Sequence, residues 1–124
     1  MRLLLDTHVL IWWARDQRLA AEVASAIGDG ANDVAISVAS LWEAEIKAAS
    51  GKLELDLDLA ADAKSGGLIT LPIEASHAVA AARLPQHHRD PFDRMLIAQA
   101  RLEGFAIVTR DPAFQAYGVP LMAA

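Results

Sequence analysis

Five short apolar runs alternate with longer segments of helical periodicity, and this alternation constrains the fold more than any other feature of the chain. Three of the runs lack the strict apolar–polar alternation of a half-exposed strand, so we expect them to be covered on both faces. Strands that alternate with helices predict an α/β sandwich with a central, mainly parallel five-stranded sheet and helices on both faces. The expected strands are Arg2–Leu5, Asp33–Ser37 and residues 68–71, 105–109 and 119–121.

The segments between these runs are expected to be helices, and glycines follow several of them where a helix should end. Their apolar residues recur at the three- and four-residue spacing of an amphipathic helix. The expected helices are Val38–Ala49 and residues 8–14, 18–27, 57–64, 74–83 and 92–103.

Composition narrows the class of protein. A chain of 124 residues that is 54% apolar forms one domain, 1–124, with a full core. A net charge of −5 without a basic run argues against binding dominated by phosphate neutralisation. The absence of cysteine excludes disulfides and thiolate zinc sites. With neither a signal peptide nor a stretch of membrane-spanning length, we expect a soluble, cytoplasmic protein.

Two acidic residues directly follow expected strands. Asp6 comes after Arg2–Leu5, and Asp111 comes just after the run 105–109. Each has a structural explanation as the N-cap of the next helix. However, the carboxyl ends of parallel strands share one rim of a sheet, where open α/β sheets bind ligands.

Glu43 lies on the expected helix Val38–Ala49 and has two explanations of similar weight. It either faces the same rim or completes a capping box with Ser40. The apolar residues of this helix predict its buried stripe, and Glu43 lies at the flank of that stripe. The stripe consists of Val38, Leu41, Trp42, Ile46 and Ala49.

Two further carboxylates open the helix 92–103. Asp90 precedes Pro91 and is typical of an N-cap, whereas Asp93 lies in the first turn of an otherwise apolar helix. A carboxylate held against a buried layer costs desolvation unless it meets a cation.

These carboxylates together predict a metal site. Converging carboxylates repel one another and retain protons unless a divalent cation neutralises them. Oxygen ligands favour Mg²⁺ or Mn²⁺, and one or two such ions are a common apparatus for phosphodiester hydrolysis.

Four stretches in this order resemble the PIN domains, specifically the VapC-type toxins of bacterial toxin–antitoxin modules. They are LLLDTH (3–8), SVASLWE (37–43), HRDPFDRMLIAQA (88–100) and VTRD (108–111). The resemblance covers essentially the whole chain. It implies a PIN-like fold and an Mg²⁺- or Mn²⁺-dependent endoribonuclease that cleaves tRNA or another structured RNA, inhibits translation and is neutralised by a VapB-like antitoxin.

The resemblance also implies roles for particular residues. Catalytic positions fall on Asp6, Glu43, Asp93 and Asp111, and the expected metal ligands are Asp6, Asp93 and Glu43, with Asp90 able to share the role of Asp93. Thr7 and Thr109 are expected to orient a carboxylate or water. A homodimer is implied, and direct DNA binding by this chain is not expected.

Other residues and functions remain open at this point. Arg89, Arg94 and Arg110 are candidates for RNA contact, with an ordinary solvated surface as the alternative. The four histidines are expected in surface or capping roles, and at most His88 touches a phosphate. The alternative functions are a metal-dependent phosphohydrolase for a small phosphate and a non-catalytic interaction module whose acids are only caps.

Overall fold

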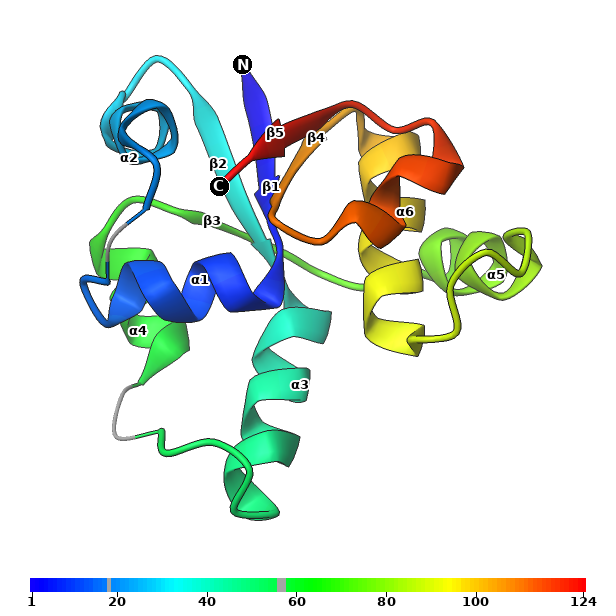
Figure 1. Ribbon diagram of the computed structural model, residues 1–124, viewed down its shortest axis with the longest axis horizontal. Helices are drawn as coiled ribbons and strands as arrows, with labels where there is room; N and C mark the ends of the chain where they lie inside the picture. The colour runs from blue at the N-terminus through cyan, green and yellow to red at the C-terminus, as the bar shows by residue number, and fades with distance from the viewer. Residues whose placement is uncertain (18, 56–57) are drawn as a thin grey trace.

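A five-stranded, entirely parallel sheet forms the centre of the protein in a computed structural model that describes residues 1–17, 19–55 and 58–124 (Figure 1). The strand order is β3-β2-β1-β4-β5. The strands are β1 (Arg2–Leu5), β2 (Asp33–Ser37), β3 (Ile69–Leu71), β4 (Ala106–Thr109) and β5 (Leu121–Ala123). The predicted α/β class and central parallel sheet are confirmed.

Helices cover both faces of the sheet (Figure 1). The helices are α1 (Thr7–Ala14), α2 (Ala21–Gly28), α3 (Val38–Ala49), α4 (Leu59–Ser65), α5 (Ala75–Arg83), α6 (Pro91–Glu103) and the 3₁₀ helix η1 (Pro112–Tyr117). Asp6, Ser37, Asp58, Asp90 and Asp111 cap helices by accepting a backbone N–H within the first turn.

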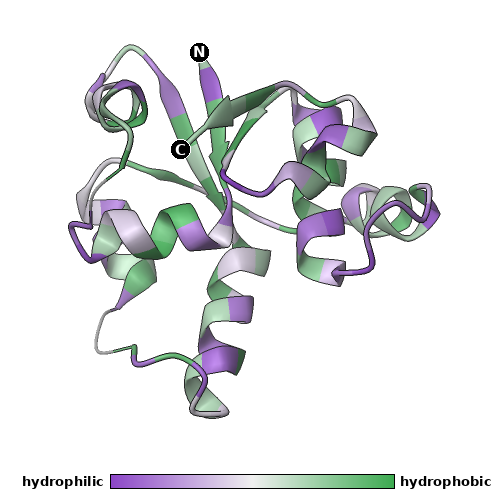
Figure 2. Ribbon diagram, in the orientation of Figure 1, coloured by the Kyte–Doolittle hydropathy of each residue, from purple (hydrophilic) through white to green (hydrophobic). Residues whose placement is uncertain are grey.

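Alternate residues of the strands enter two separate cores. Leu3 and Leu5 of β1 pack on one face with residues of α1, α2 and α4, whereas Leu4 packs on the other face with α6 and η1. The hydrophobic residues are concentrated along the central strands (Figure 2). Burial on both faces explains why these strands lack alternation in the sequence.

Strand register brings the ends of β1, β2 and β4 to one rim of the sheet. Leu3 pairs with Val34 on one side and with Ala106 on the other. The residues that follow these three strands therefore leave the sheet close together, and β2 continues directly into α3. This rim holds the predicted acidic residues.

Several predicted boundaries are wrong. The last strand begins at Leu121 rather than at 119, because the chain first leaves η1 through Gly118 in the left-handed region and Pro120 has no N–H to donate. The 3₁₀ helix η1 was not predicted. Of the predicted helices, two include residues outside the described part of the chain, namely 18 and 57.

Within the described part of the chain, every helix is too short or too polar to cross a membrane.

Candidate metal centre

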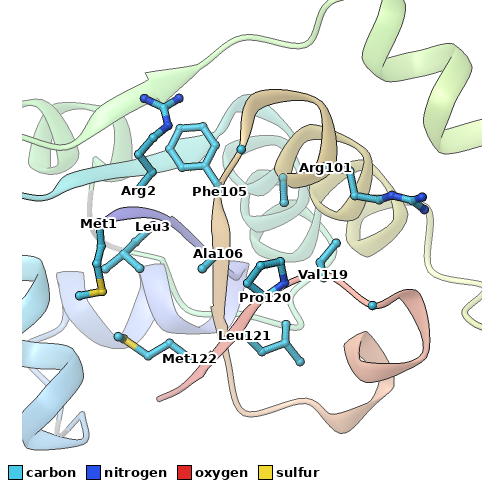
Figure 3. A pocket seen from close by; sticks show the side chains of 13 residues that line it. Met1, Arg2, Leu3, Arg101, Phe105, Ala106, Val119, Pro120, Leu121 and Met122 are labelled. Carbon is cyan, nitrogen blue, oxygen red and sulfur yellow. The ribbon is translucent and has the colours of Figure 1, made fainter.

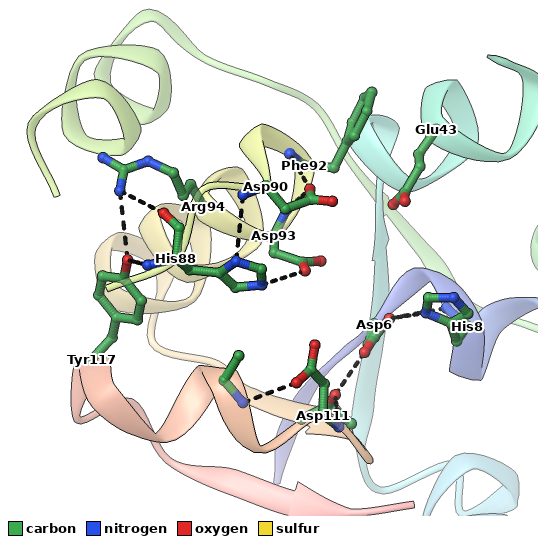
Figure 4. A network of polar contacts seen from close by, with 12 residues as sticks. Asp6, His8, Glu43, His88, Asp90, Phe92, Asp93, Arg94, Asp111 and Tyr117 are labelled. Carbon is green, nitrogen blue, oxygen red and sulfur yellow. Dashed lines mark hydrogen bonds and ion pairs between the residues drawn. The ribbon is translucent and has the colours of Figure 1, made fainter. Parts of the chain in front are cut away.

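Asp6 stands at the end of β1 and is fixed by three hydrogen-bonding groups. It is only 4% exposed. Its Oδ1 accepts the backbone N–H of His8 at 2.9 Å, and its Oδ2 accepts the hydroxyl of Thr109 at 2.6 Å. The ring of His8 lies 3.5 Å from Oδ1. Asp6 is therefore an N-cap, as the structural explanation held, and it is also buried at the rim (Figure 4).

Glu43 reaches this rim from α3, with a carboxylate that is only partly satisfied. Its Oε2 accepts a hydrogen bond from Lys47 Nζ at 2.8 Å. Its Oε1 is buried and has no hydrogen-bond partner among the described residues. Glu43 makes no capping box, because Ser37 caps α3 instead.

The buried stripe predicted for α3 is wrong. Val38, Trp42 and Ile46 are exposed, and the buried face contains Glu43 beside small or polar residues. The reason is that α3 begins at the end of β2 and turns its small residues toward the neighbouring elements. The buried residues are Ala39, Ser40, Glu43 and Ala44.

Asp90 and Asp93 divide two tasks at the start of α6. Asp90 Oδ1 accepts the backbone N–H groups of Phe92 and Asp93 at 2.9 and 3.0 Å, so this carboxylate serves as the cap. Asp93 points into the space between the acids, where its Oδ2 lies 2.8 Å from Nε2 of His88 (Figure 4). The geometry thus separates the two residues that sequence alone left interchangeable.

Asp111 approaches the same space from the end of β4. One of its oxygens accepts the backbone N–H of Ala113 at 2.9 Å, and its side chain is solvent-exposed. Asp111, Asp93 and His88 each present one ligand-type atom, and these atoms lie within 4.8 Å of one another.

The acids perturb one another electrostatically. Burial, together with the negative charges of Asp90, Asp6 and Glu43, raises the pKa of Asp93 to about 7, against a smaller lowering effect of His88. Burial opposes ionisation of Asp6 as well, but hydrogen bonds from His8 and Thr109 outweigh it and hold the pKa of Asp6 below its ordinary value. The Asp93 proton therefore substitutes for a missing positive charge.

Lys47 supplies part of the positive charge that offsets these acids. Its hydrogen bond to Glu43 raises the pKa of the Lys47 ammonium, and the charges of Asp90 and Asp93 add to the effect. These long-range contributions show that Glu43 belongs to the same electrostatic cluster as Asp90 and Asp93.

The residues present fit a divalent cation. Asp6, Glu43 and Asp93 carry the oxygen ligands that hard cations prefer and border one space (Figure 4). Among the described residues, however, the group whose ligand atoms lie within 4.8 Å of one another is Asp93, Asp111 and His88. Among the described residues the buried Oε1 of Glu43 has no hydrogen-bond partner, and burial together with the neighbouring carboxylates disfavours the ionised form of Asp93. Both features are ones that a bound cation would relieve.

The two threonines play different parts. Thr109 donates to Asp6 and also accepts the backbone N–H of Asp111 at 3.0 Å, so it links two of the acids. Thr7 contacts none of these carboxylates through a hydrogen bond in the described residues. Its hydroxyl donates instead to Ser40 Oγ at 3.0 Å and ties α1 to α3.

The arginines also differ from one another. Arg94 is 8% exposed and donates to the carbonyls of Ala81, Leu84, Pro85 and His88, so the prediction that it contacts RNA conflicts with its position. A charged group this buried requires such partners. Arg89 is exposed, and Arg110 is exposed with its guanidinium over the ring of Trp12 at 4.1 Å.

Two histidines have roles that the sequence did not reveal. His88 lies against Asp93, although it precedes α6 and shares no helical spacing with that residue. His77 was expected in a surface or capping role, yet it is 1% exposed. It does complete a capping box with Glu74, and its Nε2 lies 2.9 Å from Glu103, which ties α5 to α6.

A pocket outside this rim differs from the candidate metal centre in chemistry. It measures about 610 Å³ and lies at the amino ends of β1 and β4 (Figure 3). Among the described residues that line it, the only charged side chains are Arg2 and Arg101. Size alone therefore does not identify the metal centre, which is defined by its donors.

Comparisons with known proteins identify the family to which the chain belongs. The family model for the PIN domain matches residues 3–120. The chain is 31% identical over 121 residues to Ribonuclease VapC22 of Mycobacterium tuberculosis (strain ATCC 25618 / H37Rv), covering 94% of this chain and 92% of that protein.

Two solved structures share the fold at low sequence identity. A chain of VapBC2 from Rickettsia felis, bound to a DNA fragment from its promoter, gives a TM-score of 0.73 at 15% identity, over 99% of this chain and 98% of that chain. A chain of VapBC-5 from Mycobacterium tuberculosis, a member of the VapBC family of toxin-antitoxin systems, gives a TM-score of 0.61 at 21% identity, over 98% and 96%.

Proposed function

Because this chain belongs to the PIN domain family, we propose that it is a divalent-metal-dependent endoribonuclease acting as the toxin of a VapBC-type toxin–antitoxin pair. The observation that carries the proposal is the meeting of Asp6, Glu43 and Asp93 at one rim, with an unpartnered Glu43 oxygen and an Asp93 that retains its proton to about pH 7. The name of the M. tuberculosis relative, a ribonuclease, supports the choice of RNA as substrate.

Asp6, Glu43 and Asp93 would hold Mg²⁺ or Mn²⁺, with Asp111 contributing to a second ion or to a bridging water. When bound, such an ion supplies activation of water and stabilisation of the charge that develops on the phosphate. The sequence prediction of one or two ions stands as part of the proposal.

The protein's own residues prepare the acids for this task. Thr109 and the N–H of His8 keep Asp6 ionised and fixed, so it offers full negative charge at any pH above its lowered pKa. Lys47 holds one Glu43 oxygen and leaves the other unpartnered. With a cation bound, Asp93 would be held in its ionised form, because the added positive charge would offset the repulsion from its neighbours.

The net charge of −5 does not attract RNA to the whole surface, so contact with RNA must depend on a few basic residues near the acids. Arg89 precedes the cap of α6 and is exposed, and Arg110 precedes Asp111 on the rim. We propose that both contact phosphates that flank the cleaved bond, since their guanidinium groups are exposed beside the acids. Cleavage of tRNA or another structured RNA, with inhibition of translation in the cytoplasm, remains part of the proposal.

An exposed apolar face beside the acids supports an antitoxin partner. Trp42 is 59% exposed, and its ring meets the edge of the Phe92 ring at 5.3 Å. Large exposed apolar patches mark interaction surfaces. The VapBC assemblies with the same fold pair a toxin with an antitoxin, which is the partner we propose here. The pocket that adjoins Trp42 is lined by Ala39, Trp42, Ile73, Pro91, Phe92 and Met95.

The homodimer and the absence of direct DNA binding by this chain stay predictions.

The experiment is cleavage of total cellular RNA by the purified, antitoxin-free protein in Mg²⁺, in Mn²⁺ and in EDTA. We expect discrete fragments that require metal, and end-mapping of these fragments gives the substrate. Asp6→Asn should abolish them, and Asp33→Asn, an exposed residue at the other end of β2, should not.

The remaining outcomes separate the alternatives. Metal binding without RNA cleavage would contradict the proposed ribonuclease activity and favour a phosphohydrolase that acts on a small phosphate. Neither cleavage nor metal binding would leave the acids as helix caps in a non-catalytic module.

A further inference from the structure

The buried side chain of Arg94 fixes the loop between α5 and α6. A solvated surface residue would not make these contacts. Arg94 Nη1 donates to the carbonyls of Pro85 and His88 at 3.0 and 3.2 Å. Its Nη2 donates to the carbonyls of Ala81 and Leu84, each at 2.9 Å. One buried guanidinium thus binds the end of α5 and both ends of the loop backbone.

Tyr117 fixes the same loop from η1. Its hydroxyl donates to the carbonyl of Pro85 at 2.9 Å and accepts the backbone N–H of His88 at 2.7 Å. The N–H and the C=O of His88 are therefore both held, one by Tyr117 and the other by Arg94 (Figure 4). This clamp leaves the His88 side chain little choice of position.

The hydrogen bonds of the His88 ring determine its tautomer. The backbone N–H of Asp90 can only donate, and it points at Nδ1 over 3.3 Å. Nδ1 must then carry a lone pair, so in the neutral ring the proton resides on Nε2. Nε2 lies 2.8 Å from Asp93 Oδ2 and donates to it.

We infer that His88 is a positioning residue for the metal centre, holding Asp93 Oδ2 through its Nε2–H and leaving Oδ1 for the cation. The inference rests on the proposed function in one respect, namely that the site binds a divalent ion. Arg94 and Tyr117 act one step further away, because they fix the loop that presents His88. Residues that hydrogen-bond to a metal ligand orient that ligand and affect the affinity of the site for the metal.

Direct coordination by His88 is the competing arrangement, since its ring lies within 4.8 Å of ligand atoms on Asp93 and Asp111. Coordination through Nε2 would move the proton to Nδ1, where it would face the N–H of Asp90, and two donors would then oppose each other. The hydrogen bonds therefore favour a histidine that supports a ligand over a histidine that is one.

The test uses two substitutions of matched polarity. In His88→Gln the amide Nε2 can occupy the place of the ring Nε2 and donate to Asp93. In His88→Asn the shorter side chain can still accept from Asp90 but cannot reach Asp93. His87→Gln is the control, because His87 is an exposed neighbour whose ring contacts Tyr117 rather than an acid.

Two readouts are taken on each protein, and neither requires RNA. Nitrogen-15 NMR of the imidazole rings reports the tautomer of His88, and calorimetry with Mg²⁺ and Mn²⁺ reports affinity. We expect the Nε2–H tautomer with and without Mg²⁺, an affinity loss of about 10- to 100-fold in His88→Asn, and near wild-type affinity in His88→Gln and His87→Gln. Melting curves confirm that each variant is folded.

Three results would overturn the inference: the Nδ1–H tautomer, equal affinity in His88→Asn and wild type, or no metal binding by the wild type. An equal loss in His88→Gln and His88→Asn would show coordination instead. Failure of the proposed ribonuclease appears separately, as absence of RNA cleavage by a wild type that binds metal.

Discussion

Thr109 Oγ1 lies 2.6 Å from Asp6 Oδ2, and this one hydrogen bond joins the ends of two neighbouring strands at the proposed metal centre. The strands are paired up to Leu5 and Val108, so Asp6 and Thr109 are the next residues along each. The same hydroxyl oxygen accepts the N–H of Asp111 at 3.0 Å. A single side chain therefore sets the positions of two acids that are far apart in sequence.

Replacing Thr109 with valine should weaken the site without changing its shape. Thr109→Val leaves a buried oxygen of Asp6 without its donor, which costs about 1–3 kcal/mol of stability. The pKa of Asp6 should rise, since this hydrogen bond helps to lower it. Metal affinity, measured by calorimetry, should fall about tenfold or more.

Thr109→Ser is the matched control, because it keeps the hydroxyl and should keep the affinity. Wild-type metal affinity in Thr109→Val would show that Asp6 does not depend on this contact.

Asp93 makes the metal-free protein less stable as the pH rises. Its pKa is raised from 3.8 to about 7, so the folded protein holds this proton more tightly than the unfolded chain does. The contribution of Asp93 to the free energy of unfolding is therefore lost as the pH rises through that interval. Asp93→Asn should raise Tm at pH 8 in EDTA by about 4 °C, corresponding to about 1 kcal/mol.

The same variant should lose the stabilisation that Mg²⁺ gives to the wild type. At pH 4 the two proteins should melt at similar temperatures. A lower Tm for Asp93→Asn at pH 8 would show that ionised Asp93 is not under electrostatic strain.

Lys47 should matter most when the cation is absent. Lys47→Met leaves the 4%-exposed Glu43 without its ammonium partner, which should lower the free energy of unfolding in EDTA by about 1–3 kcal/mol. Saturating Mg²⁺ should reduce this loss, because the cation neutralises the same carboxylate.

Urea unfolding in the two conditions checks the Lys47 prediction, with Lys64→Met as an exposed control on α4. An equal loss with and without Mg²⁺ would place Glu43 outside the metal centre.

Substitutions of Arg94 and Arg89 should change different properties: the first the stability of the fold and the second the contact with RNA. Arg94→Met removes the donor of five backbone carbonyls and should cost about 3 kcal/mol or more. Arg89→Ala should change stability by no more than about 0.5 kcal/mol, but it should raise KM for RNA cleavage. Thermal melting and cleavage kinetics measure the two effects. A stable Arg94→Met protein would contradict the clamp on the loop.

The strands and the acids that follow them were predictable from sequence. Apolar runs covered on both faces indicate a parallel sheet, and parallel strands bring Asp6 and Asp111 to one rim. The buried face of α3 was not predictable in the same way. Hydropathy favours burying Trp42, whereas the structure buries the small residue Ala44 and the charged residue Glu43 and leaves Trp42 exposed.

Contacts between residues that do not follow a helical or strand spacing could not be predicted from the sequence either. His88 contacts Asp93 from a loop that Arg94 and Tyr117 hold in place, and the buried Arg94 donates to five backbone carbonyls that converge on it. Neither arrangement follows a helical or strand period. The sequence predicted Asp90 as the cap of α6, which the structure confirms, whereas the inward position of Asp93 required the geometry of α6.

The central claim is that acids from separate elements form one divalent-metal site, and a calorimetric titration with Mn²⁺ tests it most directly. The titration compares the wild type with Asp6→Asn and with the remote control Asp33→Asn. We predict that the wild type and Asp33→Asn bind Mn²⁺ alike and that Asp6→Asn loses affinity by at least about tenfold. Identical binding by Asp6→Asn and the wild type, or no binding by the wild type, would contradict the account.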